Sequence, residues 1–390
     1  MIKGDNRVRG TRVKGFIGLF ILCIFGQLSA ACAPSANQHI RQIEPEQYRA
    51  EAAPKTADVA HISDGNYAYE KLSEEGRQVY DEILTGILAH QEKITLSSSD
   101  TDVMRKAYIA VCADYGGLFW VNGYVFTKYN RGEEVVGLEF APNYVMTLEE
   151  REQTQKQIDN VVDEWLGGIS MMDTDYDKVK YIYELLSTNT EYVEEAENSQ
   201  NIISVFLNRQ TVCQGYACAV QYLMKQLGIK CVIVSGTALG DAHAWNLFQM
   251  DGEYYYMDVT WGRGRYTQNA AEKFFVDYKY MAMTTEEMLR SHIPNQELPL
   301  PECTAVENNY YIKEGKYIEE WNPDEIGTEL SEAWTEKQML ILRFADKELY
   351  NQTINYFIEK GNLAEYCSNI EQVTYMADEV WQEISFCFLE

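Results

Sequence analysis

The sequence feature that most constrains the fold is the dipeptide Asp251-Gly252, which separates two apolar runs. An Asp-Gly pair accepts the positive φ angles of a two-residue hairpin turn, so the two runs are predicted to pair as antiparallel strands. Counting outward from this turn along the two strands places Trp245 opposite Asp258. Since side chains alternate along a strand, His243 shares a face with Trp245, and Asp258 lies diagonal to it.

A helix is predicted to begin at Cys213 and to end at Gly228. Its apolar positions follow helical spacing, and Cys213 lies four residues before the first of them, on the same face: Ala217, Val220, Met224 and Leu227. Unpaired N–H groups at a helix N-terminus stabilise a thiolate and can also stabilise an oxyanion. Gln214-Gly215 lets other backbone approach this site closely.

Cys213, His243 and Asp258 together suggest a thiol nucleophile, a base, and a carboxylate that orients the base. Taken singly, each has a simpler explanation as a core cysteine, a structural histidine or a turn residue. A zinc site is the other alternative, with Cys218 and Cys231 joining Cys213 and His243. The five-residue spacing of the two helical cysteines makes them point apart, which argues against that site.

Three motifs in this stretch resemble those of the transglutaminase-like superfamily in its bacterial form. They are Cys213-Gln-Gly-Tyr-Ala, His243-Ala-Trp-Asn and Asp258-Val-Thr-Trp-Gly, within a resemblance that spans residues 176–267. The chain departs from the pattern at residues 211–212, where a glycine often precedes the cysteine, and at Gly262, where an acidic residue is common.

The resemblance implies an α+β fold with a papain-like transglutaminase core, in which the nucleophile helix packs on an antiparallel sheet and α/β regions flank it. It also implies that Cys213 is the nucleophile, that His243 is the general base and acid, and that Asp258 orients His243. No cofactor and no metal are implied. The implied activity is thiol acyl transfer, by which a protein or peptide amide is hydrolysed or transamidated through a thioester.

Aromatic and amide side chains near the site are candidates for substrate binding, and they are Tyr216, Trp245, Trp261 and Gln214. Aromatic residues are also common sheet formers, so a structural role is the simpler alternative for them. A different class of function also remains open. The chain could be a non-catalytic module of the cell envelope that binds wall peptide or glycan on the same fold.

The N-terminus has the layout of a secretory signal peptide over residues 1–31, with a basic stretch, an apolar run and small residues. Leu28-Ser-Ala-Ala-Cys32 resembles a bacterial lipobox, so Cys32 is the predicted lipidation site and residues 32–66 a flexible tether. The predicted location is extracytoplasmic, with a lipid anchor in the cell membrane or, alternatively, secreted. A net charge of −27 argues against binding to nucleic acid.

Three further regions follow the tether. Residues 67–168 are predicted to be helical with a β-meander, whose first hairpin turns at Asn122-Gly123. Residues 169–303 form the catalytic core, which opens on Asp173-Thr-Asp-Tyr-Asp. This run suggests either a calcium loop or, more simply, a capped helix start, since Lys178 stands where the loop needs glycine. Residues 304–390 form a C-terminal α/β region, with a hairpin expected around Lys313-Glu-Gly315.

Overall fold

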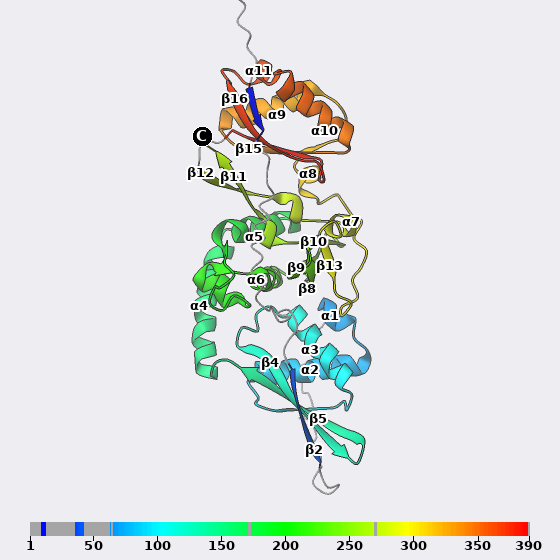
Figure 1. Cartoon of the computed structure of the whole chain (residues 1–390). Helices are drawn as coiled ribbons and strands as arrows, with labels where there is room; N and C mark the ends of the chain where they lie inside the picture. Colours follow the sequence, from blue (N-terminus) through cyan, green and yellow to red (C-terminus); the bar gives the residue numbers. More distant parts are fainter. Residues whose placement is uncertain are drawn as a thin grey trace, which may run out of the picture. The chain divides into compact units, whose positions relative to one another are not determined.

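Helices and sheets mix along the described part of the chain in the computed structural model, which confirms the predicted α+β class (Figure 1). The structure describes residues 9–12, 36–42, 63, 65–170, 173–268 and 271–388, with backbone alone at 9–12, 36–42, 266–268 and 271–273. The cleavage site of the predicted leader, Cys32 and most of the tether lie outside these residues. No helix in the described ranges is long and apolar enough to cross a membrane.

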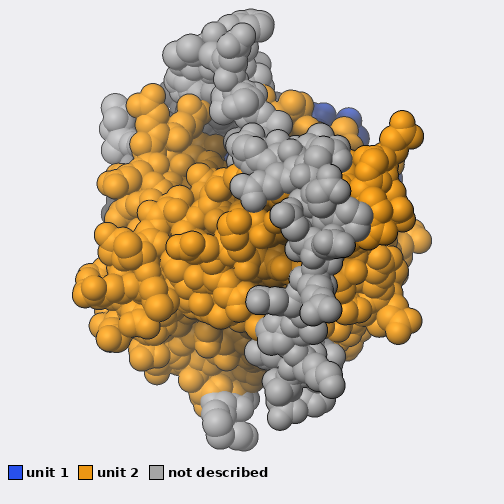
Figure 2. All heavy atoms as spheres, turned by 90° about the horizontal axis from the view of Figure 1, so that it is seen from below, with its two compact units in different colours: residues 1–26, 263–278, 306–390 blue, residues 27–262, 279–305 orange. Residues whose placement is uncertain are grey.

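The chain divides into two compact units (Figure 2). Unit 1 consists of residues 1–26, 263–278 and 306–390, and unit 2 of residues 27–262 and 279–305. Unit 2 therefore contains the predicted N-terminal region together with most of the predicted core. The start of the last stretch of unit 1 lies close to the predicted border at residue 304.

Unit 2 is built around an antiparallel sheet with strand order β10-β9-β8-β13. These strands are β8 (Cys231–Ala238), β9 (Asp241–Met250), β10 (Glu253–Met257) and β13 (His292–Pro294). The turn between β9 and β10 has positive φ at Asp251 (53°) and Gly252 (88°), as an Asp-Gly hairpin requires. Met250 pairs with Glu253, so the register that the turn predicts is confirmed.

Helix α6 (Cys213–Gln226) begins and ends as predicted, with Gly228 in the left-handed conformation just beyond it. Asn246 of β9 donates from Nδ2 to the carbonyl oxygen of Ala217 at 3.0 Å, which ties the helix to the sheet. Within the helix, Gly215 packs against the segment before it. A Cβ at this position would collide with Thr211 Oγ1 and approach the carbonyl oxygen of Ser199 to 2.8 Å.

Three helices precede the sheet, α1 (Tyr67–Glu70), α2 (Glu74–Leu88) and α3 (Thr101–Asp114). The buried carboxylate of Asp114 accepts hydrogen bonds from the Ala68 and Tyr69 N–H groups and from the Tyr80 hydroxyl. Gln221 of α6 donates to the carbonyl oxygen of Asp114 and accepts from the N–H of residue 116. This network fixes the three helices to the side of α6.

The β-meander is present, but its first turn differs from the prediction. The sheet has the order β2-β4-β5-β3 and contains β2 (Ala36–Gln42), β3 (Ile94–Leu96), β4 (Val121–Arg131) and β5 (Glu134–Tyr144). Asn122-Gly123 lies inside β4, at a register shift beside Tyr124, and not at a hairpin turn. Gly123 has a φ of 79°, which a bulge accepts as readily as a turn. The hairpin turns instead at Gly132.

Helices α4 (Leu148–Leu166) and α5 (Asp175–Asn189) follow, and each begins with a capping box. In α5 the Thr174 hydroxyl accepts from the Asp177 N–H, while Asp177 Oδ2 accepts from the Thr174 N–H. The acidic run there is therefore a helix cap, as the simpler prediction has it. Between α5 and α6 lie β6 (Glu191–Tyr192), the π-helix η1 (Ser204–Asn208) and β7 (Gln210–Thr211).

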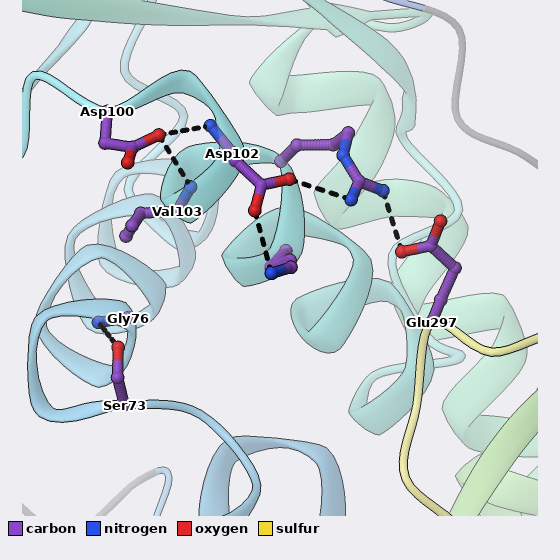
Figure 3. A network of polar contacts seen from close by, with 8 residues as sticks. Ser73, Gly76, Asp100, Asp102, Val103 and Glu297 are labelled. Atoms are coloured by element: carbon purple, nitrogen blue, oxygen red, sulfur yellow. Dashed lines mark hydrogen bonds and ion pairs between the residues drawn. The ribbon is translucent and has the colours of Figure 1, made fainter.

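The segment around β13 is fastened to β8 and to the helices before the sheet. It follows η2 (Val259–Trp261), η3 (Tyr278–Tyr280) and α7 (Thr285–Met288). Glu297 forms an ion pair with Arg105 of α3 at 2.7 Å, in a network that also includes Asp102 (Figure 3). The Tyr67 hydroxyl donates to the carbonyl oxygen of Pro299 at 2.8 Å. Both contacts attach the chain just after β13 to the helices that precede the sheet.

Unit 1 has a sheet with the order β1-β16-β17-β15-β14 and a separate hairpin. Its elements are β1 (Arg9–Arg12), β11 (Arg263–Gln268), β12 (Ala271–Val276), α8 (Tyr310–Lys313), β14 (Tyr317–Ile318), α9 (Pro323–Glu336), β15 (Met339–Phe344), α10 (Lys347–Thr353), the π-helix η4 (Ile354–Glu359), α11 (Leu363–Tyr366), β16 (Gln372–Asp378) and β17 (Glu383–Cys387). The prediction of a hairpin around Lys313 is wrong. Tyr310 begins a helix there, and Tyr317 pairs in parallel with Arg343 of β15.

Candidate active site

Cys213 is the first residue of α6, where the predicted nucleophile should stand. The residue before it, Val212, is the N-cap, and its side chain makes no capping hydrogen bond to the first N–H groups of the helix. Those N–H groups point at the start of the helix, where they favour negative charge. Cys213 is buried, with 8% of its surface exposed.

His243 lies in β9, directly opposite Gly236 of β8. Its Nε2 is 2.9 Å from Oδ2 of Asp258. With Nε2 engaged there, Nδ1 is the ring atom left for other partners, and the nearby Cys213 thiol helps to raise the pKa of the imidazole. The three residues that the motifs singled out therefore lie in the order thiol, imidazole, carboxylate.

Asp258 is the first residue beyond β10 and the N-cap of η2. Its Oδ1 accepts from the Thr260 N–H at 3.0 Å, and its own N–H donates to the carbonyl oxygen of Tyr280 at 2.9 Å. The side chain is 1% exposed, so the carboxylate is held from several directions and shielded from water. The hairpin register explains its position diagonal to His243.

Charge at the site favours a protonated imidazole. Burial opposes protonation of His243 most strongly, but the Asp258 carboxylate and the Cys213 thiol together outweigh burial and raise the pKa of His243 to about 10. For Asp258, burial alone would raise the pKa of the carboxyl above its usual value. The imidazoles of His243 and His292 outweigh burial and hold the pKa of that carboxyl well below its usual range. The imidazole is thus charged through the neutral range beside an ionised carboxylate.

A second histidine, His292, was missed by the sequence motifs. Its Nε2 lies 3.2 Å from the same Oδ2 of Asp258, and its Nδ1 lies 2.9 Å from Ser291 Oγ. It is fully buried. No sequence motif around residue 292 indicates a role at the site. The position of His292 depends on the pairing of β13 with β8, in which it lies opposite Ala238.

Two of the aromatic candidates surround the histidines. The Trp245 ring centroid lies 6.1 Å from that of His243 and 4.8 Å from that of His292. The Trp261 ring lies 5.4 Å from His243 and 4.7 Å from His292. Trp245 is almost fully buried and Trp261 partly so. Both rings are placed to fix the imidazoles, and substrate contact by them stays a prediction.

The other two candidates have their side chains engaged away from His243. Tyr216 is buried and donates its hydroxyl proton to the carbonyl oxygen of Thr190 at 2.7 Å. The Gln214 amide donates to Cys218 Sγ at 3.3 Å, one turn along α6. Tyr192 of β6 is more accessible, at 43% exposure. Burial first, and then the charges of Cys213 and other acidic groups, raise the pKa of Tyr192 to about 12, so its hydroxyl stays neutral.

A metal ion has one candidate set of ligands in the described ranges, His243, Asp258 and His292, whose ligand atoms lie within 4.8 Å of one another. Both Nε2 atoms would have to give up any proton to bind a metal. The raised pKa of His243 opposes that loss, so we interpret the set as a hydrogen-bonded network. The zinc alternative at Cys218 and Cys231 has no such cluster among the described residues.

The cysteines are consistent with a free thiol at the site. The seven from Cys112 onward are all free, and no disulfide joins any two of them. Burial raises the pKa of Cys218 to about 12, so this neighbour on α6 is a poor nucleophile. That difference makes Cys218 a suitable control in tests of Cys213.

An α+β fold thus brings a buried thiol, imidazole and carboxylate together in unit 2. Residues 164–259 match the model of the transglutaminase-like superfamily. The chain therefore carries a transglutaminase-like core domain, which confirms the resemblance of its three motifs.

Two relatives are the kyphoscoliosis peptidases of Mus musculus and Homo sapiens. Each is 23% identical to the chain over 167 residues. The match covers 37% of this chain and 25% of each relative, so the chain spans about a quarter of the length of these relatives.

Two solved structures are also similar to parts of the chain. One is a TGase (15% identity, TM-score 0.27, covering 39% of this chain and 47% of that one). The other is the periplasmic domain of TgpA from Pseudomonas aeruginosa (14% identity, TM-score 0.22, covering 32% of this chain and 54% of that one). At TM-scores this low, the assignment rests on the family match.

Proposed function

We propose that the protein is a thiol acyl-transfer enzyme that hydrolyses protein or peptide amides through a thioester on Cys213. One observation carries the proposal. The His243 imidazole lies between the thiol at the start of α6 and the Asp258 carboxylate, with a 2.9 Å hydrogen bond to the latter. This order of groups is the one that activates a thiol for attack on a carbonyl.

In the first half of the proposed reaction, the Cys213 thiolate attacks the carbonyl carbon and forms a sulfur–carbon bond. The carbonyl electrons move to oxygen, where the N–H groups at the start of α6 favour the negative charge. As the oxyanion collapses, the carbon–nitrogen bond breaks. The leaving amine takes the proton from the His243 imidazolium, and a thioester remains on Cys213.

In the second half, neutral His243 takes a proton from water, whose oxygen attacks the thioester carbon. The sulfur–carbon bond breaks, the carboxylic acid product leaves, and the thiolate and the imidazolium are restored. An amine in place of water would give a cross-linked product by the same steps. Asp258 stays ionised throughout and keeps the His243 ring in the required orientation.

A panel of peptides with side-chain and main-chain amides tests the proposal. Release of ammonia or cleavage products is measured with and without a fluorescent primary amine as the competing acceptor. We expect turnover by the wild type and by Cys218→Ala, and a loss of at least roughly 10³-fold for Cys213→Ala. Turnover that survives Cys213→Ala would exclude Cys213 as the nucleophile. A wild type inactive on the whole panel would favour a non-catalytic module that binds wall peptide or glycan.

We further propose that the enzyme works outside the cytoplasm, held to the cell membrane by a lipid on Cys32. The basic and apolar stretches before Cys32 support this proposal. In a bacterial host, the wild type should incorporate a labelled fatty acid and fractionate with membranes, while Cys32→Ala should do neither. A wild type released into the medium without label would favour plain secretion.

A further inference from the structure

We propose that His292 is a positioning residue, which holds the Asp258 carboxylate in place while His243 gains and loses its proton. The inference deepens the proposed acyl-transfer function and rests on it. The motifs of the family match end before this residue, since the matched stretch covers residues 164–259.

The hydrogen bonds of His292 define how its ring proton can be placed. Nδ1 lies 2.9 Å from the Ser291 hydroxyl, and Nε2 lies 3.2 Å from Asp258 Oδ2. A carboxylate can only accept, so the proton of this bond belongs on Nε2. In a neutral ring Nδ1 then accepts from the Ser291 hydroxyl, which defines the Nε2–H tautomer.

The sheet explains why His292 reaches Asp258. Residues that pair directly share a face, so His292 lies on the same face as Ala238 of β8 and, across β8, as His243. The residues of β8 between the two histidines are small. A Cβ on Gly236 would come within 2.8 Å of the Trp245 ring and would meet the carbonyl oxygen of residue 293. The absence of a side chain at Gly236 therefore lets the Trp245 ring and the backbone of residues 293–294 approach β8 closely, and the His292 ring packs against Trp245.

The orientation of the His292 ring is fixed from two sides. Trp245 meets it edge-on, with centroids 4.8 Å apart and an interplanar angle of 61°. Trp261 lies 4.7 Å away at 47°. A ring held in this way can offer one N–H in one direction and loses little freedom on doing so.

Asp258 depends on such a donor during catalysis. It accepts three hydrogen bonds, from His243, from His292 and from the Thr260 N–H. In the acyl-enzyme His243 must be neutral to act as a base, so the buried carboxylate then has no cation beside it. Burying an ionised carboxylate is costly unless hydrogen bonds compensate for the lost water. His292 and the Thr260 N–H are the two other hydrogen-bond donors to this carboxylate.

Loss of the His292 donor should therefore make Asp258 a stronger attractor for the proton on His243. The other ionisable groups that act on this pair are Cys213 of α6, beside His243, and Tyr192 of β6, which interacts with Asp258. Neither of these is altered by a substitution at residue 292. The expected consequence is an acidic limb of thioester hydrolysis that moves to higher pH.

The first test is a nitrogen NMR titration of the histidine side chains in the full chain, which has only five histidines. His292→Gln, which retains an N–H donor, assigns the signal of residue 292 by its disappearance. We expect the signals of the Nε2–H tautomer for His292 in the wild type, because Nε2 lies against the Asp258 carboxylate. An Nδ1–H tautomer, or an imidazole that exchanges between both forms, would overturn the inference. The NMR titration requires no catalytic activity.

The second test measures the rate of hydrolysis of a preformed Cys213 thioester against pH. His292→Phe keeps a ring without the donor and should move the acidic limb up by about one pH unit. His292→Gln should restore the limb to its wild-type position. Ser291→Ala, which leaves His292 in place but frees its Nδ1, should move it in the same direction by less.

A uniform loss of rate with an unmoved limb in both His292→Phe and Ser291→Ala would mean that His292 only packs the core, and would overturn the inference. If His292→Phe does not fold, Ser291→Ala and the NMR titration decide the matter. Failure of the wild type to form a thioester would instead refute the proposed function. The tautomer of His292 would still be measured independently in that case.

Discussion

At the scale of single residues, the site depends on one buried hydrogen bond between His243 and Asp258. The order of thiol, imidazole and carboxylate follows from the positions of three motifs, which the sequence alone places correctly on a helix start and a hairpin. What the motifs could not reveal is the second imidazole on the carboxylate. His292 lies 34 residues beyond Asp258 and reaches it only through the pairing of an edge strand.

Asp258→Asn should lower kcat by roughly 10⁴-fold and leave the fold intact, because an amide cannot stabilise the imidazolium and favours the wrong tautomer. Steady-state kinetics on a peptide substrate check this outcome. Asp241→Asn is the matched control, since this carboxylate lies in the same strand as His243 but is exposed. Equal activity in Asp258→Asn and the wild type would remove Asp258 from the proposed mechanism.

The His243–Asp258 pair should also make stability depend on pH. The folded state raises the pKa of His243 from 6.5 to about 10, so its contribution is complete below about pH 6.5 and is lost as pH rises through about 10. The difference in unfolding free energy between wild type and Asp258→Asn should therefore shrink between pH 7 and 10.

Denaturant unfolding of both proteins at several pH values measures that difference. Lys225, whose burial lowers its pKa to about 8, titrates in the same window. It is present in both proteins, so its effect cancels in the difference. A difference that stays constant from pH 7 to 10 would show that His243 does not hold the extra proton.

At the scale of elements, local turn chemistry decided what could be predicted. Asp251-Gly252 correctly fixed the register of β9 and β10, and the apolar spacing correctly fixed α6. Asn122-Gly123 misled, because the positive φ that suits a turn also suits a bulge, and only the pairing partner in β5 distinguishes the two. The helix that replaces the expected hairpin at Tyr310 likewise depends on its Asn309 cap.

The start of α6 should be sensitive to a methyl group at Gly215. Its Cβ would collide with Thr211 Oγ1 and crowd the carbonyl oxygen of Ser199, so Gly215→Ala should shift the first turn that carries Cys213. Overpacking of this kind costs about 1–3 kcal/mol. We expect a lower melting temperature together with slower alkylation of Cys213.

Gly168→Ala is the control for that substitution, because its Cβ would make only an ordinary contact, 3.6 Å from the Tyr181 hydroxyl. The two variants are compared by thermal unfolding and by the rate at which the site thiol reacts. If Gly215→Ala behaves like Gly168→Ala in both measurements, close packing at Gly215 does not position the nucleophile.

At the scale of the whole molecule, the chain holds two units with separate cores. The principal apolar cluster of unit 1 draws all its buried members from the last stretch of the chain: Ile326, Leu330, Ala333, Leu340, Leu342, Phe344, Leu349, Tyr350, Phe357, Ile358, Leu363, Cys367, Ile370, Val373, Tyr375, Ile384, Phe386 and Phe388. The composition of the chain indicated room for such a division but could not locate it, since the units interleave along the sequence.

Residues 306–390 should therefore fold when expressed alone. Their sheet and helices enclose this apolar cluster, and the Tyr311 hydroxyl donates to the buried carboxylate of Glu383 within the same stretch. Circular dichroism and a cooperative thermal transition check the prediction. A fragment without a cooperative transition would show that the rest of the chain is needed to complete this core.

The central claim is that His243 activates Cys213, and the alkylation rate of Cys213 at pH 6 tests it most directly. An ordinary thiol is less than about 1% ionised at that pH, so a thiol whose proton resides on an imidazole should react roughly 10²-fold faster. Iodoacetamide followed by peptide mapping should label Cys213 well before Cys112, Cys218 or Cys303. His243→Ala should abolish that advantage. Equal rates at Cys213 in wild type and His243→Ala would contradict the account.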